Sequence, residues 1–463
     1  MRSRIAIFSA LSIRQLAQIS KHFAIELKGK KKKHDLLTAV ASARKHSISS
    51  ILDILEGREL QQLAIRLDLS ASGNRDDLIA AISGDKRRII RASILRSLRR
   101  QGFRFSGGRL VFPDAADKDR LRQLHTEAVA HKRGIAHGTL GRKESGLLEW
   151  IANGDEVVPQ SISPALIEVL PGSTEELLFR YACLHWSIPV SSGYGRRLRY
   201  IVMDSANNKL IGVIGLGDPV FALAPRDNWI GWTSPRRRVG LHHVLDAFVL
   251  GAVPPYTHLL CGKLVAMLAA SREVTSRFQQ KYGGKESLIS QTERSGEVAL
   301  ITTTSALGRS SIYNRLTFRS EPMFIPVGFT RGSGEFQFLN GLYDEMSAFA
   351  AQRLTPTAKS ELWGTGFRNR REVVKKCIHA AGLHQDLLYH GVQREVYIVP
   401  TASNSAEFLR GDNQTLHFYD RQAAEIFAWF RERWLLRRAE RDPSFATFAR
   451  ASYALWPSGG KSD

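Results

Sequence analysis

The alternation of apolar and polar positions is clearest between about residues 244 and 338, where a strand-like run gives way to helical spacing. The run 244–253 is dense in strand-forming residues and stops at Pro254 and Pro255, neither of which can donate a hydrogen bond to a sheet. Beyond a short loop, apolar residues recur at the spacing of a helix buried on one side, at Leu264, Val265, Leu268 and Val274. The pattern therefore predicts a central strand, a turn and a helix.

The same alternation continues to the end of this stretch. An apolar run at 298–301 predicts another strand, residues 310–318 predict a helix that carries Tyr313, and residues 324–329 predict a third strand. Upstream, two apolar runs flank Asn207 and Asn208, which suit a left-handed turn, so these runs predict a hairpin that adds earlier strands. The elements form a βαβαβ unit in an α/β protein with a mixed sheet at its core.

Within residues 1–84 one apolar pattern occurs twice. Each copy predicts a helix, a short extended link, a glycine turn and a second helix. This order resembles the helix-extended-helix modules of the SAP and Rho-N type, and the resemblance implies nucleic-acid binding. The two copies consist of Leu16, Ile19, Phe23, Ile25 and Gly29, and of Leu60, Leu63, Leu67, Leu69 and Gly73.

The first copy carries four lysines between its glycine and its second helix: Lys30, Lys31, Lys32 and Lys33. Each lysine could displace a counterion from a phosphate backbone lying against this turn. The second copy is nearly neutral at the same place, with Asn74, Arg75 and Asp76, so the first copy is the stronger contact candidate. The alternative is a pair of small protein-binding modules with a solvated lysine run.

Residues 85–112 carry the next concentration of positive charge. Ile and Leu at helical spacing alternate with Arg and Lys, which predicts an amphipathic basic helix containing Arg87 and Arg88. Gly102 ends this helix, and a glycine pair at 107–108 predicts a hairpin turn. A helical connector completes a region at 85–190, the predicted core occupies 191–345, and residues 346–463 are expected to be mostly helical.

Charge and composition narrow the class of partner. The 463 residues carry a formal net charge of +22 and are 43% hydrophobic, so we expect a folded protein with a polyanionic partner. No run approaches the roughly 18 apolar residues of a membrane-spanning helix, and no cleavage site follows the basic start, so we expect a cytoplasmic protein with no membrane partner. Cys183, Cys261 and Cys377 are isolated, which argues against a disulfide framework or a cysteine metal site.

Two family resemblances meet in the core. The order of elements from 244 to 338 resembles the second half of the N-acetyltransferase fold. Four motifs resemble DruA, the family of anti-phage proteins in Druantia defence systems, and the likeness extends from about Lys86 to the basic helix near Trp434. This resemblance implies a subunit of a multi-protein antiviral system whose partners include a helicase-like protein. The motifs are residues 226–232 (RDNWIGW), 278–283 (FQQKYG), 310–316 (SSIYNRL) and 327–334 (VGFTRGSG).

These motifs supply a candidate cleft. One charged aromatic loop and one glycine-rich loop lie about 100 residues apart in the sequence, and we expect folding to bring both to one edge of the core sheet. Their members are Arg226, Asp227, Trp229 and Trp232, and Arg331, Gly332 and Gly334. The expected nucleic-acid contacts reach phosphates without reading bases, and phage DNA is the expected ligand. The predicted contact residues are Lys30, Lys31, Lys32, Lys33, Arg87, Arg88, Arg236, Arg237 and Arg238.

An enzymatic role is left open. Acetyltransferases of this fold hold the cofactor pyrophosphate with glycines at a helix N-terminus, whereas residues 257–262 (THLLCG) keep only the last glycine, so we expect no acetyl-CoA and no other cofactor. Tyr313 matches the general acid of that family, so a divergent N-acetyltransferase is one alternative. A metal-dependent nuclease is another, although no spacing identifies a metal site. Its candidate carboxylates are Asp204, Asp218, Asp227, Asp246 and Glu335.

Overall fold

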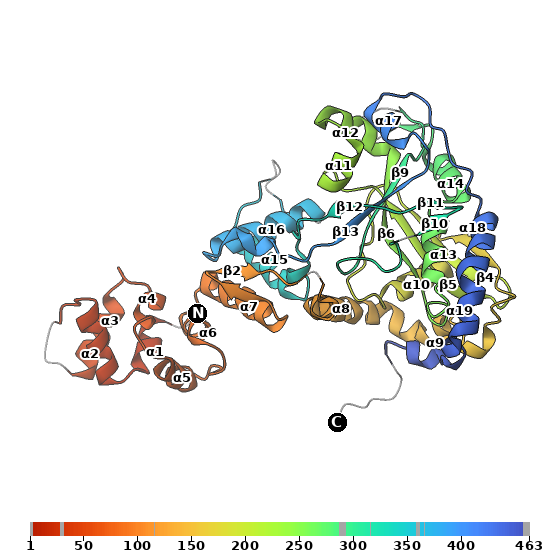
Figure 1. Cartoon of the computed structure of the whole chain (residues 1–463). Coiled ribbons are helices and arrows are strands. Elements are labelled where there is room, and N and C mark those ends of the chain that lie inside the picture. Colours follow the sequence, from red (N-terminus) through yellow and green to blue (C-terminus); the bar gives the residue numbers. More distant parts are fainter. Residues whose placement is uncertain are drawn as a thin grey trace. The chain divides into compact units, whose positions relative to one another are not determined.

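The computed structural model describes residues 3–27, 32–114, 116–286, 293–314, 316–357, 362–364 and 366–456. The chain forms two compact units, and Figure 1 colours it along the sequence. Unit 1 consists of Met1–Val111 and Gln337–Leu388, and unit 2 of Phe112–Phe336 and Tyr389–Asp463. The chain therefore leaves unit 1, builds most of unit 2 and returns to unit 1 before it completes unit 2.

Unit 1 begins with short helices around an apolar core of their own. The helices predicted for the two repeats are present, as α2 and α3 in the first copy and α5 and α6 in the second. Ser12 and Asn74 start α2 and α6 with reciprocal capping boxes to Gln15 and Asp77, which satisfies backbone amides that a helix start leaves unpaired. The bounds are α1 (Arg4–Ser9), α2 (Ile13–His22), α3 (Lys33–Ser42), α4 (Ile48–Leu52), α5 (Gly57–Arg66) and α6 (Arg75–Ser83).

The remainder of unit 1 joins the predicted basic helix to two helices from the later segment. This helix, α7, buries Ile90, Ile94 and Leu98, and it contacts both α15 and α16. Gly107 and Gly108 have φ of 54° and 77° at the turn of the predicted hairpin, a backbone region that favours glycine. The bounds are α7 (Lys86–Arg100), β1 (Arg104–Ser106), β2 (Arg109–Val111), α15 (Leu342–Arg353) and α16 (Phe367–Ala380).

Unit 2 is built on a mixed sheet whose strand order is β12-β13-β9-β6-β5-β4-β3. Strands β6 and β9 pair in parallel, and the other neighbours in this sheet are antiparallel. The prediction of an α/β protein with a mixed sheet is therefore confirmed. The strands are β3 (Pro164–Glu168), β4 (Leu198–Asp204), β5 (Lys209–Gly217), β6 (Val244–Ala252), β9 (Leu300–Thr304), β12 (Ile325–Phe329) and β13 (Glu395–Pro400).

Helices cover both faces of this sheet. Because side chains alternate along a strand, Leu245 and Ile301 face one layer while Val244 and Leu300 face the other. The first layer contains α13 (Cys261–Leu268), α14 (Arg272–Tyr282) and α18 (Ala423–Phe430). The opposite face carries α10 (Thr174–Cys183), α11 (Ala224–Ile230) and α17 (Ser405–Arg410). Other elements are α8 (Lys118–Leu140), α9 (Glu144–Leu148), α12 (Ser234–Gly240), α19 (Leu436–Arg441), β7 (Lys285–Glu286), β8 (Glu293–Arg294), β10 (Thr317–Phe318) and β11 (Glu321–Pro322).

The predicted βαβαβ unit needs two corrections. Residues 311–314, including Tyr313, form turns rather than a helix. The Ser310 hydroxyl accepts hydrogen bonds from the backbone amides of Ile312 and Tyr313 at 3.2 and 3.1 Å, as at a helix start, but the backbone from Thr317 pairs in the hairpin of β10 and β11 instead of continuing a helix. In addition, β13 from the C-terminal region lies between β9 and β12, so the last two predicted strands are not neighbours. Local patterns identified these strands but not the insertion between them.

None of the helices in the described ranges is long and apolar enough to cross a lipid bilayer. Cys183, Cys261 and Cys377 are free and buried, and burial raises the pKa of each thiol. A thiol held in its neutral form is a weak nucleophile and a weak metal ligand. These cysteines therefore contribute to packing.

Candidate functional site

Positive charge is concentrated in unit 1. Its 163 residues hold 30 Lys and Arg against 14 Asp and Glu, a net charge of +16. The 300 residues of unit 2 hold 36 Lys and Arg against 30 Asp and Glu, a net charge of +6. A polyanion is therefore attracted mainly to unit 1.

Helix α7 uses part of this charge to hold unit 1 together. Arg88 forms an ion pair with Asp53, and Arg96 forms one with Asp77 across 2.9 Å. Arg87, in contrast, is exposed in the first turn of the helix. Of the two predicted contact residues on α7, the structure thus leaves Arg87 open to solvent and gives Arg88 an internal partner.

A hollow of about 390 Å³ opens where α7 begins, beside the end of α15. Lys86 and Arg87 line it from α7, Arg353 lines it from the last turn of α15, and all three are exposed. The Asp85 carboxylate also lines the hollow and accepts a hydrogen bond from the backbone amide of Arg87 at 3.0 Å. Three cations around one carboxylate leave a surplus of positive charge that suits a phosphate group.

The lysine run of the first repeat lies at the start of α3. Lys32 and Lys33 are exposed there, whereas Lys30 and Lys31 lie outside the described residues. Lys32 occupies the N-cap position without a side-chain hydrogen bond to the helix, whereas Asn74 caps α6 in the second repeat. Because a cation at a helix N-terminus opposes the helix dipole, this placement does not serve helix stability.

The motif at residues 226–232 forms a buried ion-pair cluster in unit 2. The Arg226 guanidinium is fully buried, pairs with Asp227 at 2.7 Å, and donates to the carbonyl oxygens of Val220 and Phe221 at 2.9 and 3.2 Å. Burial lowers the pKa of Arg226, and the Asp227 carboxylate opposes that effect. Gly231 ends α11 in the left-handed region, with φ of 75°.

Two more side chains complete this cluster. The Arg226 guanidinium lies 5.5 Å from the ring centre of Trp232, and Arg237 pairs with Asp227 at 3.1 Å. Trp229 is partly buried against the neighbouring apolar cluster. The indole nitrogen of Trp232 and the Nε of Arg237 are buried, and neither has a hydrogen-bond partner in the part of the chain that the structure describes.

Asp246 lies beside this cluster on β6. Its carboxylate accepts a hydrogen bond from the Thr302 hydroxyl at 3.0 Å, across the parallel pair β6 and β9. Burial raises the pKa of Asp246 to about 6, and the Thr302 hydrogen bond and the nearby Arg226 act in the opposite direction. Asp246 is thus a partly buried acid whose pKa lies above its usual value.

The three predicted contact arginines of α12 have different surroundings. Arg236 donates to the carbonyl oxygen of Arg410 at 2.5 Å, and Arg237 belongs to the ion pair with Asp227. Arg238 is exposed. Arg237 is therefore a structural residue, whereas Arg236 and Arg238 remain exposed cations.

The glycine-rich loop containing Arg331, Gly332 and Gly334 lies against residues 389–392. The carbonyl oxygen of Gly332 accepts from the backbone amide of Gly391 at 3.0 Å, and a Cβ on Gly332 would come within 2.8–3.0 Å of that backbone. A Cβ on Gly328 of β12 would meet the Pro225 side chain of α11 at 3.4 Å. The strand that leads into this loop is therefore adjacent to the Arg226 helix. The segment predicted as a charged aromatic loop is thus largely helical, since Arg226, Asp227 and Trp229 belong to α11. That this helix and the glycine-rich loop line one cleft stays a prediction.

A buried basic cluster next to this loop has no signature in the sequence. The His125 ring lies 3.8 Å from that of Phe336, and neither of its nitrogens has a hydrogen-bond partner among the described residues. Burial, with Arg394 nearby, lowers the pKa of His125 to about 2 and that of His390 to about 3. His125 is more than 260 positions from His390 and Arg394 in the sequence, and only the folded chain brings it next to them.

The structure places Tyr313 in the core. Its ring stacks on Phe324 with centres 5.0 Å apart, and burial raises its pKa to about 12. The start of α13 is also covered: a Cβ on Gly262 would lie 3.4 Å from the Ile312 side chain, and Lys263 donates to the Ile312 carbonyl at 3.1 Å. Side chains therefore fill the approach by which a phosphate would reach this helix N-terminus.

The candidate carboxylates have different surroundings. Asp227 and Asp246 both lie near the Arg226 guanidinium, which pairs with Asp227. Asp204 accepts from the Tyr256 hydroxyl at 2.9 Å, whereas Asp218 pairs with Arg196 at 2.8 Å. Within the described ranges, no group of three His, Cys, Asp or Glu residues could hold a metal ion.

The fold and its charged surfaces define a mixed α/β protein that carries a basic helical unit. The family model described as Druantia protein DruA matches residues 115–411. The Druantia protein DruA of Escherichia coli (strain UMEA 4076-1) is 37% identical over 359 residues, which is 77% of this chain and 88% of that protein. The chain therefore belongs to the DruA family. No solved structure matches it, so the likeness to acetyltransferases stays a prediction.

Proposed function

We propose that this protein is a component of a Druantia-type anti-phage defence system and binds nucleic acid through unit 1. Membership of the DruA family supports the first part. The single observation that carries the second is the net charge of +16 on unit 1, more than twice that of the larger unit 2. A cytoplasmic location, phage DNA as the ligand and a helicase-like partner subunit belong to the same proposal.

The proposed contact is with phosphates rather than bases. Several of the cations that remain exposed in unit 1 stand at helix ends, namely Lys32, Lys33, Lys86, Arg87 and Arg353. Phosphate contacts position a nucleic acid without reading its sequence, and their number sets how steeply affinity falls with salt. Binding should therefore be largely independent of sequence and strongly dependent on salt.

A duplex titration at several salt concentrations tests this function. The full-length protein should bind a labelled duplex with a steep salt dependence and should leave it uncut in Mg²⁺. Replacing Lys86 and Arg87 by Ala should reduce the log-log salt slope by up to about 2. Arg142 and Lys143 are a matched pair of adjacent exposed cations in unit 2, and their replacement should leave the slope unchanged. Equal slopes for all three proteins would refute unit 1 as the contact surface.

The enzymatic alternatives have less support in the geometry. A metal-dependent nuclease needs a cluster of metal ligands, and no group of three His, Cys, Asp or Glu that could hold a metal ion is found among the described residues. An acetyltransferase needs an open helix N-terminus, and the Ile312 side chain lies against the start of α13. The same titration detects a nuclease, because cleavage in Mg²⁺ would appear as shortened duplex. Micromolar binding of acetyl-CoA in a calorimeter would favour the acetyltransferase.

A further inference from the structure

The sheet of unit 2 ends in an open edge at β3, which pairs with β4 on one side. The backbone amide of Val169 donates to Arg199 and that of Ser205 donates to Ser163, both at 2.8 Å, so the odd-numbered residues of this segment bond to β4. The N–H and C=O groups of Leu166 and Glu168 therefore point away from the sheet. No backbone hydrogen bond reaches them within the described residues.

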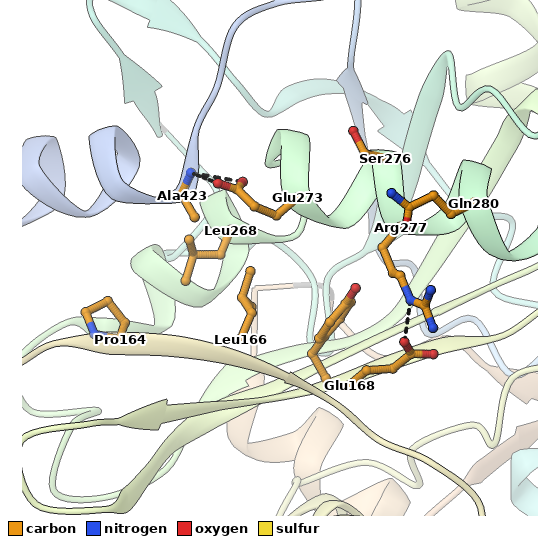
Figure 2. Close-up of a pocket in the computed structure, with 10 residues that line it drawn as sticks. Pro164, Leu166, Glu168, Leu268, Glu273, Ser276, Arg277, Gln280 and Ala423 are labelled. Carbon is orange, nitrogen blue, oxygen red and sulfur yellow. Dashed lines mark hydrogen bonds and ion pairs between the residues drawn. The ribbon is translucent and has the colours of Figure 1, made fainter.

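A groove of about 540 Å³ runs along the same strand (Figure 2). Side chains of Pro164, Leu166 and Glu168 project into it from β3, and Ser276, Arg277 and Gln280 of α14 face them. The residues with unpaired backbone groups thus also supply the side chains of the groove. An extended chain placed here would find backbone partners and side-chain contacts together.

The charged residues of the groove indicate which kind of peptide it would bind. Arg277 and Lys281 both pair with Glu168, at 2.6 and 2.7 Å, so two cations share one carboxylate. Arg277 keeps 45% of its side chain exposed, which leaves positive charge facing solvent at this end. Toward the other end, Leu166 and Leu268 line the groove beside Glu273, whose carboxylate accepts hydrogen bonds from the backbone amide of Ala423 at 3.0 Å (Figure 2).

Apolar side chains also surround the edge on the outside. Ile167 is 39% exposed and Leu170 is 53% exposed. Proline and charge are common means of keeping an edge strand unpaired, and β3 has Pro164 at its first residue and Glu168 at its last. Leu166, which lies between them, has neither.

We propose that the edge of β3 binds an extended segment of another protein by strand addition. The segment carries alternating apolar side chains and an acidic residue that faces Arg277. Its backbone bonds to Leu166 and Glu168, and Pro164 ends the pairing because it has no N–H. A second copy of this chain fits less well, since antiparallel pairing of β3 with itself about Leu166 would set Pro164 opposite Glu168 and lose a donor.

A random decapeptide display library is the probe for this proposal. Full-length protein should select peptides that alternate apolar residues and contain Asp or Glu at one fixed place. Leu166→Pro removes an outward N–H and keeps the hydrogen bonds to β4 made by residues 165 and 167, so it should weaken the selected peptides at least tenfold. Arg277→Glu should weaken them by a similar factor and should favour peptides with Lys in place of the acid.

Hydrogen exchange tests the same proposal on the wild-type protein, without any substitution. Bound peptide should slow exchange at the amides of Leu166 and Glu168 and leave that of Ile167, already bonded to β4, unchanged. Failure to select any peptide, or selected peptides that bind Leu166→Pro as tightly as wild type, would overturn the proposal. Dimerisation that Leu166→Pro abolishes would also overturn it, by assigning the edge to a second copy.

Discussion

Unit 1 carries a larger net positive charge than unit 2, and each unit holds some basic residues in ion pairs and leaves others exposed. In unit 2, Arg226 and Arg237 share Asp227 in a buried cluster, and Arg196 pairs with Asp218 at 2.8 Å. In unit 1, Lys86 and Arg87 remain exposed around a hollow. The comparison teaches that a run of positive charge in the sequence is not yet a binding surface, because the carboxylates that folding brings close decide which charges stay available.

The largest expected effect tests the available charge of unit 1. Changing Lys30, Lys31, Lys32 and Lys33 together to Ala should lower the log-log salt slope of duplex binding by up to about 4, because each lysine can release one counterion. Over a tenfold change in salt, such a slope corresponds to as much as about 10⁴ in affinity. The thermal midpoint should not fall. Parallel salt titrations of equal intercept would show that this run is merely solvated.

The next effect tests the structural charge of unit 2. Arg226→Ala should cost about 3–5 kcal/mol in the free energy of unfolding, because it leaves a buried carboxylate with Arg237 as its remaining cation. Chemical denaturation monitored by tryptophan fluorescence measures the loss. The exposed neighbour Arg238 provides the control, and Arg238→Ala should change stability by less than about 0.5 kcal/mol. If Arg226→Ala left the free energy of unfolding nearly unchanged, the buried ion pairs of unit 2 would not be more important for stability than its exposed cations.

A smaller, pH-dependent effect belongs to Asp246. Its pKa is raised from 3.8 to about 6 in the folded protein, so its contribution to stability is complete below about pH 4 and is lost as pH rises through about 6. Asp246→Asn should remove this loss, and the variant should gain about 1–3 kcal/mol relative to wild type between pH 4 and pH 7. Denaturation at several pH values measures the difference. A difference that does not change with pH would contradict the prediction.

The sequence predicted local elements better than their assembly. The run ended by Pro254 and the pattern repeated at Leu16 and Leu60 are local signals, and the strand and helices they predict are present. The position of β13 between β9 and β12 depends on pairing between residues 66–100 positions apart, which no local period encodes. The helix predicted around Tyr313 was wrong because the backbone from Thr317 pairs with β11, a partner that the local pattern does not show.

The same limit applies to the candidate site. Composition predicted a polyanionic partner, and the runs of charged residues supplied the candidate contact residues. The sequence alone does not distinguish Arg87 from Arg88, or Arg238 from Arg237, because the two residues of each pair are adjacent arginines in the same charged run. The difference arises from Asp53 and Asp227, whose positions relative to these arginines are set by tertiary packing.

The smallest effect compares the two repeats of unit 1 with each other. Asn74 caps α6 by accepting from the backbone amide of Asp77 at 3.0 Å, whereas Lys32 holds the same position of α3 without a capping hydrogen bond. Asn74→Ala should cost about 1 kcal/mol in the free energy of unfolding and leave the salt slope of duplex binding unchanged. Lys32→Asn should do the reverse, adding up to about 1 kcal/mol of stability while lowering the slope by up to about 0.9. Denaturation of both variants should give stability changes of opposite sign, and salt titration should show a lower slope for Lys32→Asn alone. If Lys32→Asn left the slope unchanged while still stabilising α3, the lysine would be a poor cap with no role in binding.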